Sequence, residues 1–355
     1  MGFSRLQPAE WAPHAAVWIG WPSAADLWEE DLAPAQAEVA SFIRAILFPD
    51  VNDPKGVKTT GERVELICNG ADAHAAAEAF RAKLPIPDLL RLHKAPMGDI
   101  WLRDTGPIFV TGAGPLAASA FTFNGWGGKY QLGEDERLAD IISEIAGVPL
   151  KRFDGLIAEG GALEPDGEGT VITTRQCLLN PNRNPGLSEK DIEAILREAI
   201  GAEKVIWLDE GLAGDHTDGH VDNLARFIAP GKVMCQHPTG DDDPNKDVLN
   251  AIRETLSKAT GADGRKLEVI EIPSPGAALM DDEPVAASHM NFYIANHSVV
   301  MPSYGALSGD EEAAEQALAI LHDVASRPHA HAIDASHLLT GGGSFHCISQ
   351  QQPAI

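Results

Sequence analysis

The feature that most constrains the fold of this chain is a weak internal repeat in the order of its predicted elements. From residue 64 onward the order strand, helix, strand, strand occurs five times, although the residues themselves are not repeated. Such units bury their apolar faces against one another, so the repeat predicts a closed radial array of one supersecondary structure. A doubly wound parallel sheet also alternates strands and helices, but its crossovers do not give adjacent strand pairs without an intervening helix. We therefore expect an α/β fold of five units in a single domain spanning residues 1–355.

The predicted units follow a strand at Ala16–Trp21, a helix at Pro34–Leu47 and a loop at Phe48–Glu62. The units, in chain order, are Val64–Asn69, Ala71–Lys83, Leu89–Lys94 and Ile108–Thr111; Ala117–Asn124, Glu134–Ala146, Lys151–Asp154 and Ala162–Glu164; Thr170–Thr174, Ser188–Ile200, Lys204–Asp209 and Asp222–Ala229; Lys232–Gln236, Asp243–Lys258, Lys266–Pro273 and Asn291–Asn296; Val299–Tyr304, Gly309–Ala325, Ala330–Ala335 and Phe345–Gln350. The segments around Asp104, His220 and Cys347 lie near the final strands of the first, third and fifth units. In a radial array these places converge on the axis, so we expect them to form one site.

The charge of the chain limits the classes of ligand. Of its 355 residues 44% are hydrophobic and 22% are charged, and the formal net charge is −25. The composition is that of an ordinary globular protein, but the acidic excess argues against nucleic acid and anionic membranes as partners. A negative field favours a small cationic ligand, although acidity that only aids solubility explains the composition equally well.

The cysteines and the start of the chain indicate a reducing compartment. Cys68, Cys177, Cys235 and Cys347 are far apart and form no CxxC pair, which is neither a disulfide framework nor a zinc ribbon. Residues 1–8 lack the apolar core of a signal peptide, and no apolar run approaches the roughly 18 residues of a membrane span. We expect a cytoplasmic protein in which the first three cysteines are core residues.

The candidate nucleophile is Cys347, at the end of Gly341-Gly342-Gly343-Ser344-Phe345-His346-Cys347. Three consecutive glycines allow positive φ angles and a close approach of the backbone to another group. A cysteine on such a turn is either a small buried hydrophobe or a nucleophile. Acids and a histidine elsewhere in the chain favour the second interpretation.

The segment Asp99-Ile100-Trp101-Leu102-Arg103-Asp104 is a candidate cation site. Asp104 can accept a planar cation, with Trp101 as a wall or cation–π face. The alternative is a structural turn in which Arg103 pairs with Asp99 at the surface.

Two glycine-rich segments extend the candidate site. Phe123-Asn124-Gly125-Trp126-Gly127-Gly128 offers Trp126 as a second wall, or it is an ordinary packed turn. Glu159-Gly160-Gly161 places an acid just ahead of a close backbone approach, or it is a solvated turn.

The densest titratable run is Asp215-His216-Thr217-Asp218-Gly219-His220-Val221-Asp222-Asn223. On a strand, His220 and Asp222 would point to the same face. Alternatively, His216 and His220 with Asp218 and Asp222 could ligate zinc or another divalent metal, or the run could be a surface loop. Gly219 and the lack of a third obvious histidine weaken the metal interpretation.

Together these segments resemble the agmatine deiminase family of guanidine-modifying enzymes. The matching pieces are Trp101-Leu102-Arg103-Asp104-Thr105-Gly106-Pro107, Phe123–Gly128, Glu159-Gly160-Gly161, Leu178-Leu179-Asn180-Pro181-Asn182-Arg183-Asn184-Pro185, Thr217–Asn223, Gly341–Gln352, and Pro8-Ala9-Glu10-Trp11 through Trp21-Pro22. The resemblance spans essentially the whole chain. It implies the pentein fold, an α/β propeller of five ββαβ units with a pseudo-fivefold arrangement. It also implies hydrolysis of agmatine to N-carbamoylputrescine and ammonia, in putrescine and polyamine biosynthesis, without a metal or cofactor.

The resemblance further implies a role for each matching residue. Cys347 is the nucleophile that forms a covalent thiouronium intermediate, His220 the general acid and base, Asp104 and Asp222 the guanidinium anchors, and Glu159 the acid that orients the histidine. We also expect substrate contacts from Trp101, Trp126 and Asp218.

Three departures from the family pattern leave the substrate open. His216 stands where the family often has an acid, Ser344-Phe345 replaces Asn-Ile, and Ser23–Trp28 lacks an arginine-bearing pattern. Free or peptidyl arginine are therefore alternative substrates. A metal-dependent hydrolase and a non-catalytic binder of polyamine-like cations are alternative classes of function. The oligomeric state is open, and a homo-oligomer is compatible with the sequence.

Overall fold

The computed structural model describes residues 5–58, 60–280 and 282–355. The strands are β1 (His14–Gly20), β2 (Val64–Cys68), β3 (Leu90–Lys94), β4 (Ile108–Val110), β5 (Ala117–Thr122), β6 (Leu150–Ile157), β7 (Glu164–Pro165), β8 (Thr170–Thr174), β9 (Lys204–Leu208), β10 (Ala225–Ala229), β11 (Lys232–His237), β12 (Glu268–Pro273), β13 (Leu279–Met280), β14 (Glu283–Pro284), β15 (Tyr293–Ile294), β16 (Ser298–Ser303), β17 (His329–Asp334) and β18 (Ser349–Pro353). The helices are α1 (Ala25–Trp28), α2 (Leu32–Leu47), α3 (Gly70–Arg81), α4 (Leu102–Thr105), α5 (Gly125–Gly128), α6 (Leu138–Ala146), α7 (Arg175–Leu178), α8 (Glu189–Ile200), α9 (Lys246–Lys258), α10 (Gly305–Ser308), α11 (Glu311–Val324) and α12 (Ser336–Thr340). Five 3-10 turns are η1 (Glu29–Asp31), η2 (Pro87–Leu89), η3 (Asp135–Arg137), η4 (Gly160–Ala162) and η5 (Val221–Asn223).

Five sheets share one plan. In β4-β5-β6, β7-β8-β9, β10-β11-β12 and β15-β16-β17, the first strand is antiparallel to the second and the second is parallel to the third. In the sheet β18-β1-β2-β3, β18 is antiparallel to β1, and β1, β2 and β3 are parallel. A helix lies between the parallel strands along the chain, as α6 does between β5 and β6, because a parallel pair needs a crossover connection. The short hairpin β13-β14 stands apart from this plan.

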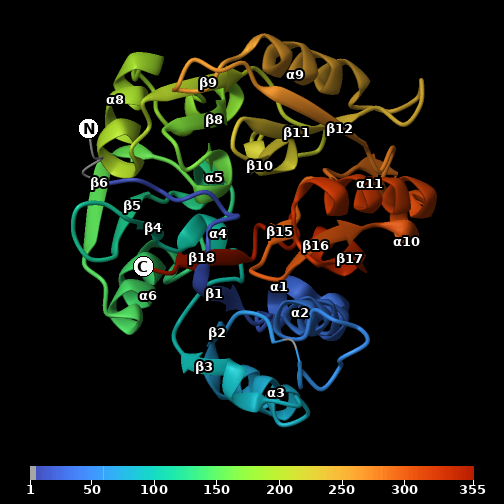
Figure 1. Cartoon of the computed structure of the whole chain (residues 1–355). Coiled ribbons are helices and arrows are strands. Elements are labelled where there is room, and N and C mark those ends of the chain that lie inside the picture. Colours follow the sequence, from blue (N-terminus) through green and yellow to red (C-terminus); the bar gives the residue numbers. More distant parts are fainter. Residues whose placement is uncertain (1–4, 59, 281) are drawn as a thin grey trace.

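The sheets follow one another around the molecule, and strand β18 lies beside β1 where the ring of elements closes (Figure 1). β18 pairs with β1 in a register that sets Trp18 opposite Gln350 and Ile19 opposite Ser349. The indole of Trp18 also donates to the side chain of Gln352 at 3.0 Å. The C-terminal strand therefore completes the sheet that the N-terminal strand begins.

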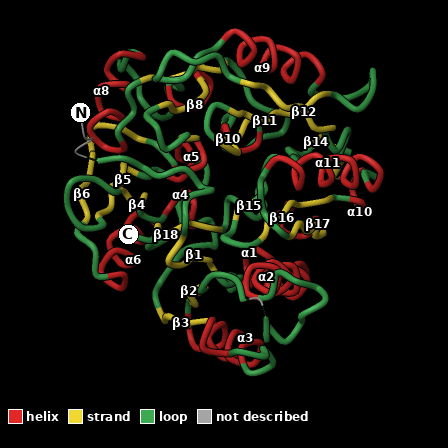
Figure 2. Tube along the Cα trace, viewed as in Figure 1, coloured by secondary structure: helices red, strands yellow, loops and turns green. Residues whose placement is uncertain are grey.

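The long helices lie at the rim and the strands and their loops lie toward the middle (Figure 2). Helix α8 shows why such a segment is helical: Ser188 and Asp191 form a capping box and Gly201 ends the helix with a φ of 78°. Its buried residues Ile192, Leu196 and Ile200 recur every four positions, so one face packs inward. Strands β2 and β8 are buried along their whole length, as expected for parallel strands covered on both faces. In the described residues, no helix combines the length and apolar character needed to cross a bilayer.

The predicted grouping of strands is wrong in one respect. The fourth strand of a predicted unit pairs with the first strand of the next, as β4 does with β5 and β10 does with β11. A short connection lets consecutive strands form an antiparallel pair, whereas hydrophobic periodicity carries no information on pairing.

The predicted strand positions of two site segments are also wrong. His220 and Asp222 precede β10, which begins at Ala225, and Asp222 lies in the turn η5. Phe345 and Cys347 lie in a turn before β18 begins at Ser349. These residues therefore occupy loops that lead into strands, where a rigid sheet positions them.

Candidate active site

Cys347 lies at the floor of the site on the turn that follows α12. Gly342 takes a φ of 98°, and a Cβ on Gly343 would lie 2.6 Å from the Trp101 ring and 3.1 Å from Cys347 Sγ. The glycines are therefore required by both backbone conformation and close packing. Residue Cys347 is only 5% exposed. Asn291 donates from Nδ2 to its Sγ at 3.0 Å, and Asn291 Oδ1 accepts from the Cys347 amide at 3.2 Å.

Two buried carboxylates face this thiol from different parts of the chain. Asp104, on α4, accepts hydrogen bonds at 2.9 Å from the Trp126 indole and at 2.9 Å from the Gly161 amide. Asp222 Oδ2 lies 3.6 Å from Cys347 Sγ and 2.7 Å from His346 Nδ1. Asp222 Oδ1 is buried and has no hydrogen-bond partner among the described residues. That oxygen is free to accept from a cationic ligand.

The Trp126 side chain reaches Asp104 because of an unusual backbone. Trp126 has φ 51° and ψ 51°, a left-handed conformation, between glycines at 125 and 127 with φ of 70° and 82°. A bulky residue with positive φ is strained and persists where the surroundings hold it, often at functional sites. Here the strain aims the indole N–H at the carboxylate.

His220 lies behind the carboxylates and is fully buried. Its Nδ1 is 3.8 Å from Asp104 Oδ2 and its Nε2 is 3.7 Å from Glu159 Oε2. Neither ring nitrogen has a hydrogen-bond partner in the described part of the chain. The ring is thus flanked by two acids, whose charges favour its protonated form.

Gly161, in the turn η4, marks the centre of the cluster. A Cβ at this position would lie 2.6 Å from His220 Nδ1, 2.9 Å from Asp104 Oδ1 and 3.1 Å from Asp222 Oδ2. Three functional groups therefore pack against Gly161 so closely that only glycine fits there.

The clustering of acids sets the proton affinities of the site. Burial, reinforced by Asp222 and Asp104, raises the pKa of the Cys347 thiol well above its usual value. Burial also raises the pKa of Asp104 to about 6. For His220, burial lowers the pKa, but Asp104, Cys177 and Glu159 outweigh it and raise the pKa well above the usual value. Without substrate, the site thus favours a neutral thiol beside an imidazolium.

A cavity of about 190 Å³ is lined by two residues of this cluster, Asp104 and Cys347. Its walls are aromatic: Trp126 and Tyr130 on one side, and Trp101 and Trp28, whose rings stack at 6.1 Å, on the other. Asp99 accepts from the indoles of Trp28 at 2.9 Å and Trp101 at 3.0 Å, so it fixes the second wall rather than pairing with Arg103. An apolar slot with carboxylates at its base suits a cation at the end of an aliphatic chain.

At the mouth of the cavity, Tyr130 OH lies 2.8 Å from His216 Nδ1. In the described residues, the one group of three potential metal-ligand atoms within 4.8 Å of one another is Glu159, Cys177 and His220, without His216. The proposed metal site of His216 and His220 is therefore not assembled. Arg183 Nε also contacts Glu159 Oε1 at 2.8 Å, which sets a positive charge where a metal would need a ligand.

The structure brings most of the predicted site residues together. Cys347, His220, Asp104, Asp222 and Glu159 form the cluster, and Trp101 and Trp126 line the cavity above it. Asp218 does not line the cavity: its carboxylate contacts Lys129 at 2.6 Å and Arg183 at 2.9 Å. The buried cysteines Cys68 and Cys235 lie in strands β2 and β11, away from the cavity lining.

Sequence reasoning missed the residues that hold the site groups in place. Asn291 sits between apolar residues and gave no signal of a polar role. His346 adjoins the nucleophile, but only the fold shows that it contacts Asp222. Arg183 lies in the segment Leu178–Pro185, and no local pattern there predicts its ion pair with Glu159.

Residues 6–353 match the family described as Porphyromonas-type peptidyl-arginine deiminase, and the chain belongs to this family. The agmatine deiminase of Stutzerimonas stutzeri (strain A1501) is 39% identical over 98% of this chain and 95% of that protein. The solved agmatine deiminase of Enterococcus faecalis is 29% identical with a TM-score of 0.86, covering 99% of this chain and 96% of that chain. The C. jejuni agmatine deiminase with substrate bound is 26% identical with a TM-score of 0.83, at 99% and 96% coverage.

Proposed function

We propose that this protein hydrolyses agmatine to N-carbamoylputrescine and ammonia through a covalent intermediate on Cys347. The observation that carries the proposal is the clustering of Asp104, Asp222 and His220 around Gly161, with the Asp222 carboxylate 3.6 Å from the Cys347 thiol. Agmatine deiminases among its relatives, matched over nearly their whole length, support the same substrate.

Substrate binding prepares the nucleophile. A guanidinium held between Asp104 and Asp222 offsets the two negative charges that raise the pKa of the thiol. The thiol then loses its proton to the surrounding acids or solvent, and the thiolate stands next to the guanidinium carbon. The aromatic walls hold the aliphatic chain, which lowers the orientational cost of attack.

The first half-reaction forms a carbon–sulfur bond. Attack by the thiolate on the central carbon gives a neutral tetrahedral adduct. His220, held as an imidazolium by its neighbouring acids, protonates one amino group, and the carbon–nitrogen bond breaks to release ammonia. A cationic S-alkylthiouronium on Cys347 and a neutral imidazole remain.

The second half-reaction consumes one water. Neutral His220 takes a proton from the water as its oxygen bonds to the thiouronium carbon. The carbon–sulfur bond then breaks to regenerate the Cys347 thiolate, and the ureido product leaves as the hydroxyl of the adduct loses its proton. Of the two protons lost by the thiol and the adduct, one returns to Cys347 and the other converts the ammonia released earlier to ammonium. Glu159, ion-paired with Arg183 at 2.8 Å, stays ionised beside His220 and holds the ring in place.

The remaining expectations belong to the same proposal. The five similarly built sheets support a pseudo-fivefold α/β propeller that spans residues 1–355 as one domain. All groups used above are side chains of the protein, so the reaction as written needs no cofactor. We place the enzyme in the cytoplasm, in the supply of putrescine and other polyamines.

Deimination of arginine, free or in a peptide, is the alternative, because the family description names peptidyl-arginine. The discriminating experiment measures ammonia release from agmatine, free arginine and an end-blocked arginine peptide side by side. We expect agmatine to be turned over, with a ureido product one mass unit heavier. Trapping by acid quench should show an adduct on Cys347. Preferential turnover of the blocked peptide would replace agmatine by peptidyl arginine.

A further inference from the structure

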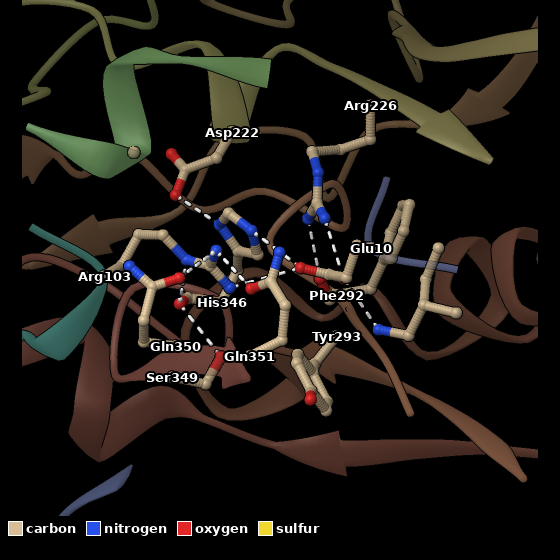
Figure 3. A network of polar contacts seen from close by, with 12 residues as sticks. Glu10, Arg103, Asp222, Arg226, Phe292, Tyr293, His346, Ser349, Gln350 and Gln351 are labelled. Carbon is tan, nitrogen blue, oxygen red and sulfur yellow. Dashed lines mark hydrogen bonds and ion pairs between the residues drawn. The ribbon is translucent and has the colours of Figure 1, made fainter. Parts of the chain in front are cut away.

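The motif that contains Glu10 and the histidine that precedes the nucleophile have no part in the mechanism above. Figure 3 shows the ring of His346 between the carboxylates of Asp222 and Glu10. His346 Nδ1 lies 2.7 Å from Asp222 Oδ2, and Nε2 lies 3.0 Å from Glu10 Oε2. Residues from the two ends of the chain thus meet beneath a carboxylate of the site.

The contact from His346 determines how Asp222 is oriented. Because Asp222 Oδ2 contacts His346, the other oxygen, Oδ1, is the one that can accept a hydrogen bond from a ligand. Oδ1 is buried and has no partner among the described residues. Asp222 is 1% exposed, so water does not replace a lost contact at low cost. If Oδ2 lost its donor, the carboxylate would be free to rotate away from the productive orientation.

Glu10 in turn fixes the ring of His346. Its Oε1 accepts from the Ile294 amide at 2.8 Å and contacts Arg226 Nη2 at 2.8 Å. Its Oε2 accepts from Arg103 Nη2 at 3.2 Å. Both oxygens are therefore held on two sides, and the acid is a rigid support.

Neighbouring charges of opposite sign act on the pKa values of His346 and Asp222. Burial, Arg103 and Arg226 outweigh Glu10 and Asp222, so the pKa of His346 is lowered from its usual value. For Asp222, burial raises the pKa, but His346 and other cationic neighbours outweigh it and lower the pKa. A proton on Nδ1 of His346 gives Asp222 its hydrogen bond and keeps that acid ionised.

We propose that His346 is a positioning residue whose Nδ1–H orients Asp222 toward a guanidinium or amidinium, with Glu10 holding the ring. The proposed function supplies the identity of the cation, but the geometry applies to any planar amidine-like cation. A histidine that only fills space would not depend on a particular ring nitrogen. The proposed role depends on Nδ1, because that nitrogen makes the contact with Asp222.

The test compares His346→Asn, His346→Gln and His346→Ala. An asparagine amide can stand in for Nδ1, whereas a glutamine amide stands in for Nε2. The readout is alkylation of Cys347 by 2-chloroacetamidine, whose C–Cl bond breaks as the thiolate bonds to its carbon, relative to neutral iodoacetamide. This rate ratio reports cation recognition without requiring agmatine turnover.

We expect the ratio to fall about tenfold to a hundredfold in the Gln and Ala variants, and to stay within about threefold of wild type in the Asn variant. KM for agmatine should follow the same order. The proposal would be overturned if the rate ratio fell equally in the Asn and Gln variants, or if the Gln variant kept more of it than the Asn variant. It would also be overturned if wild type did not prefer 2-chloroacetamidine to iodoacetamide.

Two further variants keep the result interpretable. His93→Asn removes a histidine that contacts Glu65 at 2.6 Å in the outer sheet, and should leave the ratio unchanged. If the His346 variants do not fold, Glu10→Gln should still lower the ratio by about threefold, and an unchanged ratio would count against the proposal. If wild type preferred the amidinium reagent but did not turn over agmatine, the proposed function would be wrong and the role of His346 would stand.

Discussion

Cys347 differs from the core cysteines Cys68 and Cys235 in what surrounds its sulfur, and it differs from Cys177, whose Sγ lies 3.9 Å from Glu159 Oε2, in lining the cavity. Asn291 donates to Cys347 Sγ, and Asp222 lies 3.6 Å away. By contrast, burial raises the pKa of Cys68 to about 12. A core thiol of this kind is inert, whereas Cys347 has charged neighbours whose effect a cationic substrate reverses.

We therefore expect Cys347→Ser to lower kcat for agmatine by at least about a thousandfold, because a serine hydroxyl is scarcely ionised near neutral pH. The melting temperature should stay near that of wild type. Cys68→Ser and Cys235→Ser are matched controls that should cost about 1–3 kcal/mol of stability and keep kcat within about twofold. Wild-type activity in Cys347→Ser would remove the assigned nucleophile.

Asp104 should set the acid limb of the pH profile. Its pKa is raised to about 6, mainly by burial, and only the ionised form attracts a guanidinium. We expect kcat/KM to rise with pH through about 6.

The raised pKa of Asp104 also affects stability, because the folded state binds the proton more tightly than the unfolded chain, whose Asp pKa is about 3.9. The contribution of Asp104 to the unfolding free energy therefore falls as pH rises between these values.

Trp126→Phe tests this assignment of the acid limb. The indole N–H that it removes donates to Asp104 at 2.9 Å and lowers the pKa of that acid. We expect the midpoint of kcat/KM against pH to move upward by about half to one unit. Trp28→Phe removes a donor to Asp99 instead and should leave the midpoint in place. A midpoint that moves downward in Trp126→Phe would contradict the assignment.

At the scale of elements, the short turn η4 shapes the site more than any long helix does. It donates the Gly161 amide to Asp104, and the lack of a side chain at Gly161 lets His220, Asp104 and Asp222 pack directly against it. In Gly161→Ala the methyl group would lie 2.6 Å from His220 Nδ1, a distance that forces His220 or η4 to move. We expect kcat/KM for agmatine to fall by at least about a hundredfold, consistent with displacements of about 1 Å at a reacting centre.

Gly155→Ala in β6 is the matched control, since its added Cβ would meet only the end of Ile195 at 4.0 Å. It should retain activity and stability within about 0.5 kcal/mol. If Gly161→Ala kept wild-type kinetics, the close packing of η4 against His220, Asp104 and Asp222 would not be what places these groups for catalysis.

The order of the elements could be predicted from the sequence because each helix and strand carries its own periodicity. Helix α8 was predicted one residue from its observed start, since its cap residues are local. Strand pairing was not predictable in the same way: β4 and β5 join two units that the periodicity had placed apart. The closure of β18 on β1 joins the two ends of the chain, and no local pattern reports such a contact.

For the site, motifs indicated the residues that face the cavity, because reactive residue types on glycine-rich loops are visible in a sequence. The supporting layer was not visible. Asn291 and His346 act through single contacts at 3.0 and 2.7 Å, made only after distant segments pack together. Asp218 shows the converse, because this acid belongs to the densely titratable run 215–223 but its carboxylate contacts Lys129 and Arg183 instead of the cavity.

At the scale of the whole molecule, a net charge of −25 surrounds a site that receives a cation. A field of this sign raises the encounter rate of cationic substrates. Raising the ionic strength from about 0.01 M to about 1 M shortens the screening length from about 30 Å to about 3 Å. We expect kcat/KM for agmatine to fall several-fold over this range while kcat changes little. A salt-independent kcat/KM would show that the charge serves solubility only.

The same charge distribution predicts the choice between agmatine and arginine. None of the arginines in the described residues lines the inner cavity; Arg103 contacts Glu10 at 3.2 Å and Arg183 contacts Glu159 at 2.8 Å. The α-carboxylate of arginine would enter a slot lined by Asp99 and Asp104 without a cation to pair with it. Burying an unpaired carboxylate costs several kcal/mol, and each 1.4 kcal/mol is about tenfold in kcat/KM.

We expect agmatine to exceed arginine in kcat/KM by about a hundredfold or more, measured as initial rates of ammonia release. Arginine amide is the decisive control, because it keeps the bulk of arginine and removes its charge. If desolvation of the carboxylate is the cause, the amide should recover most of the loss, and raising the salt concentration should narrow the gap between agmatine and arginine only slightly, since the penalty is short-ranged. An amide as poor as arginine would instead assign the discrimination to the width of the aromatic slot between Trp101 and Trp126. Comparable rates for arginine and agmatine would mean that a positive group, such as Lys129 in the outer groove beside Tyr130, reaches the carboxylate when substrate is bound.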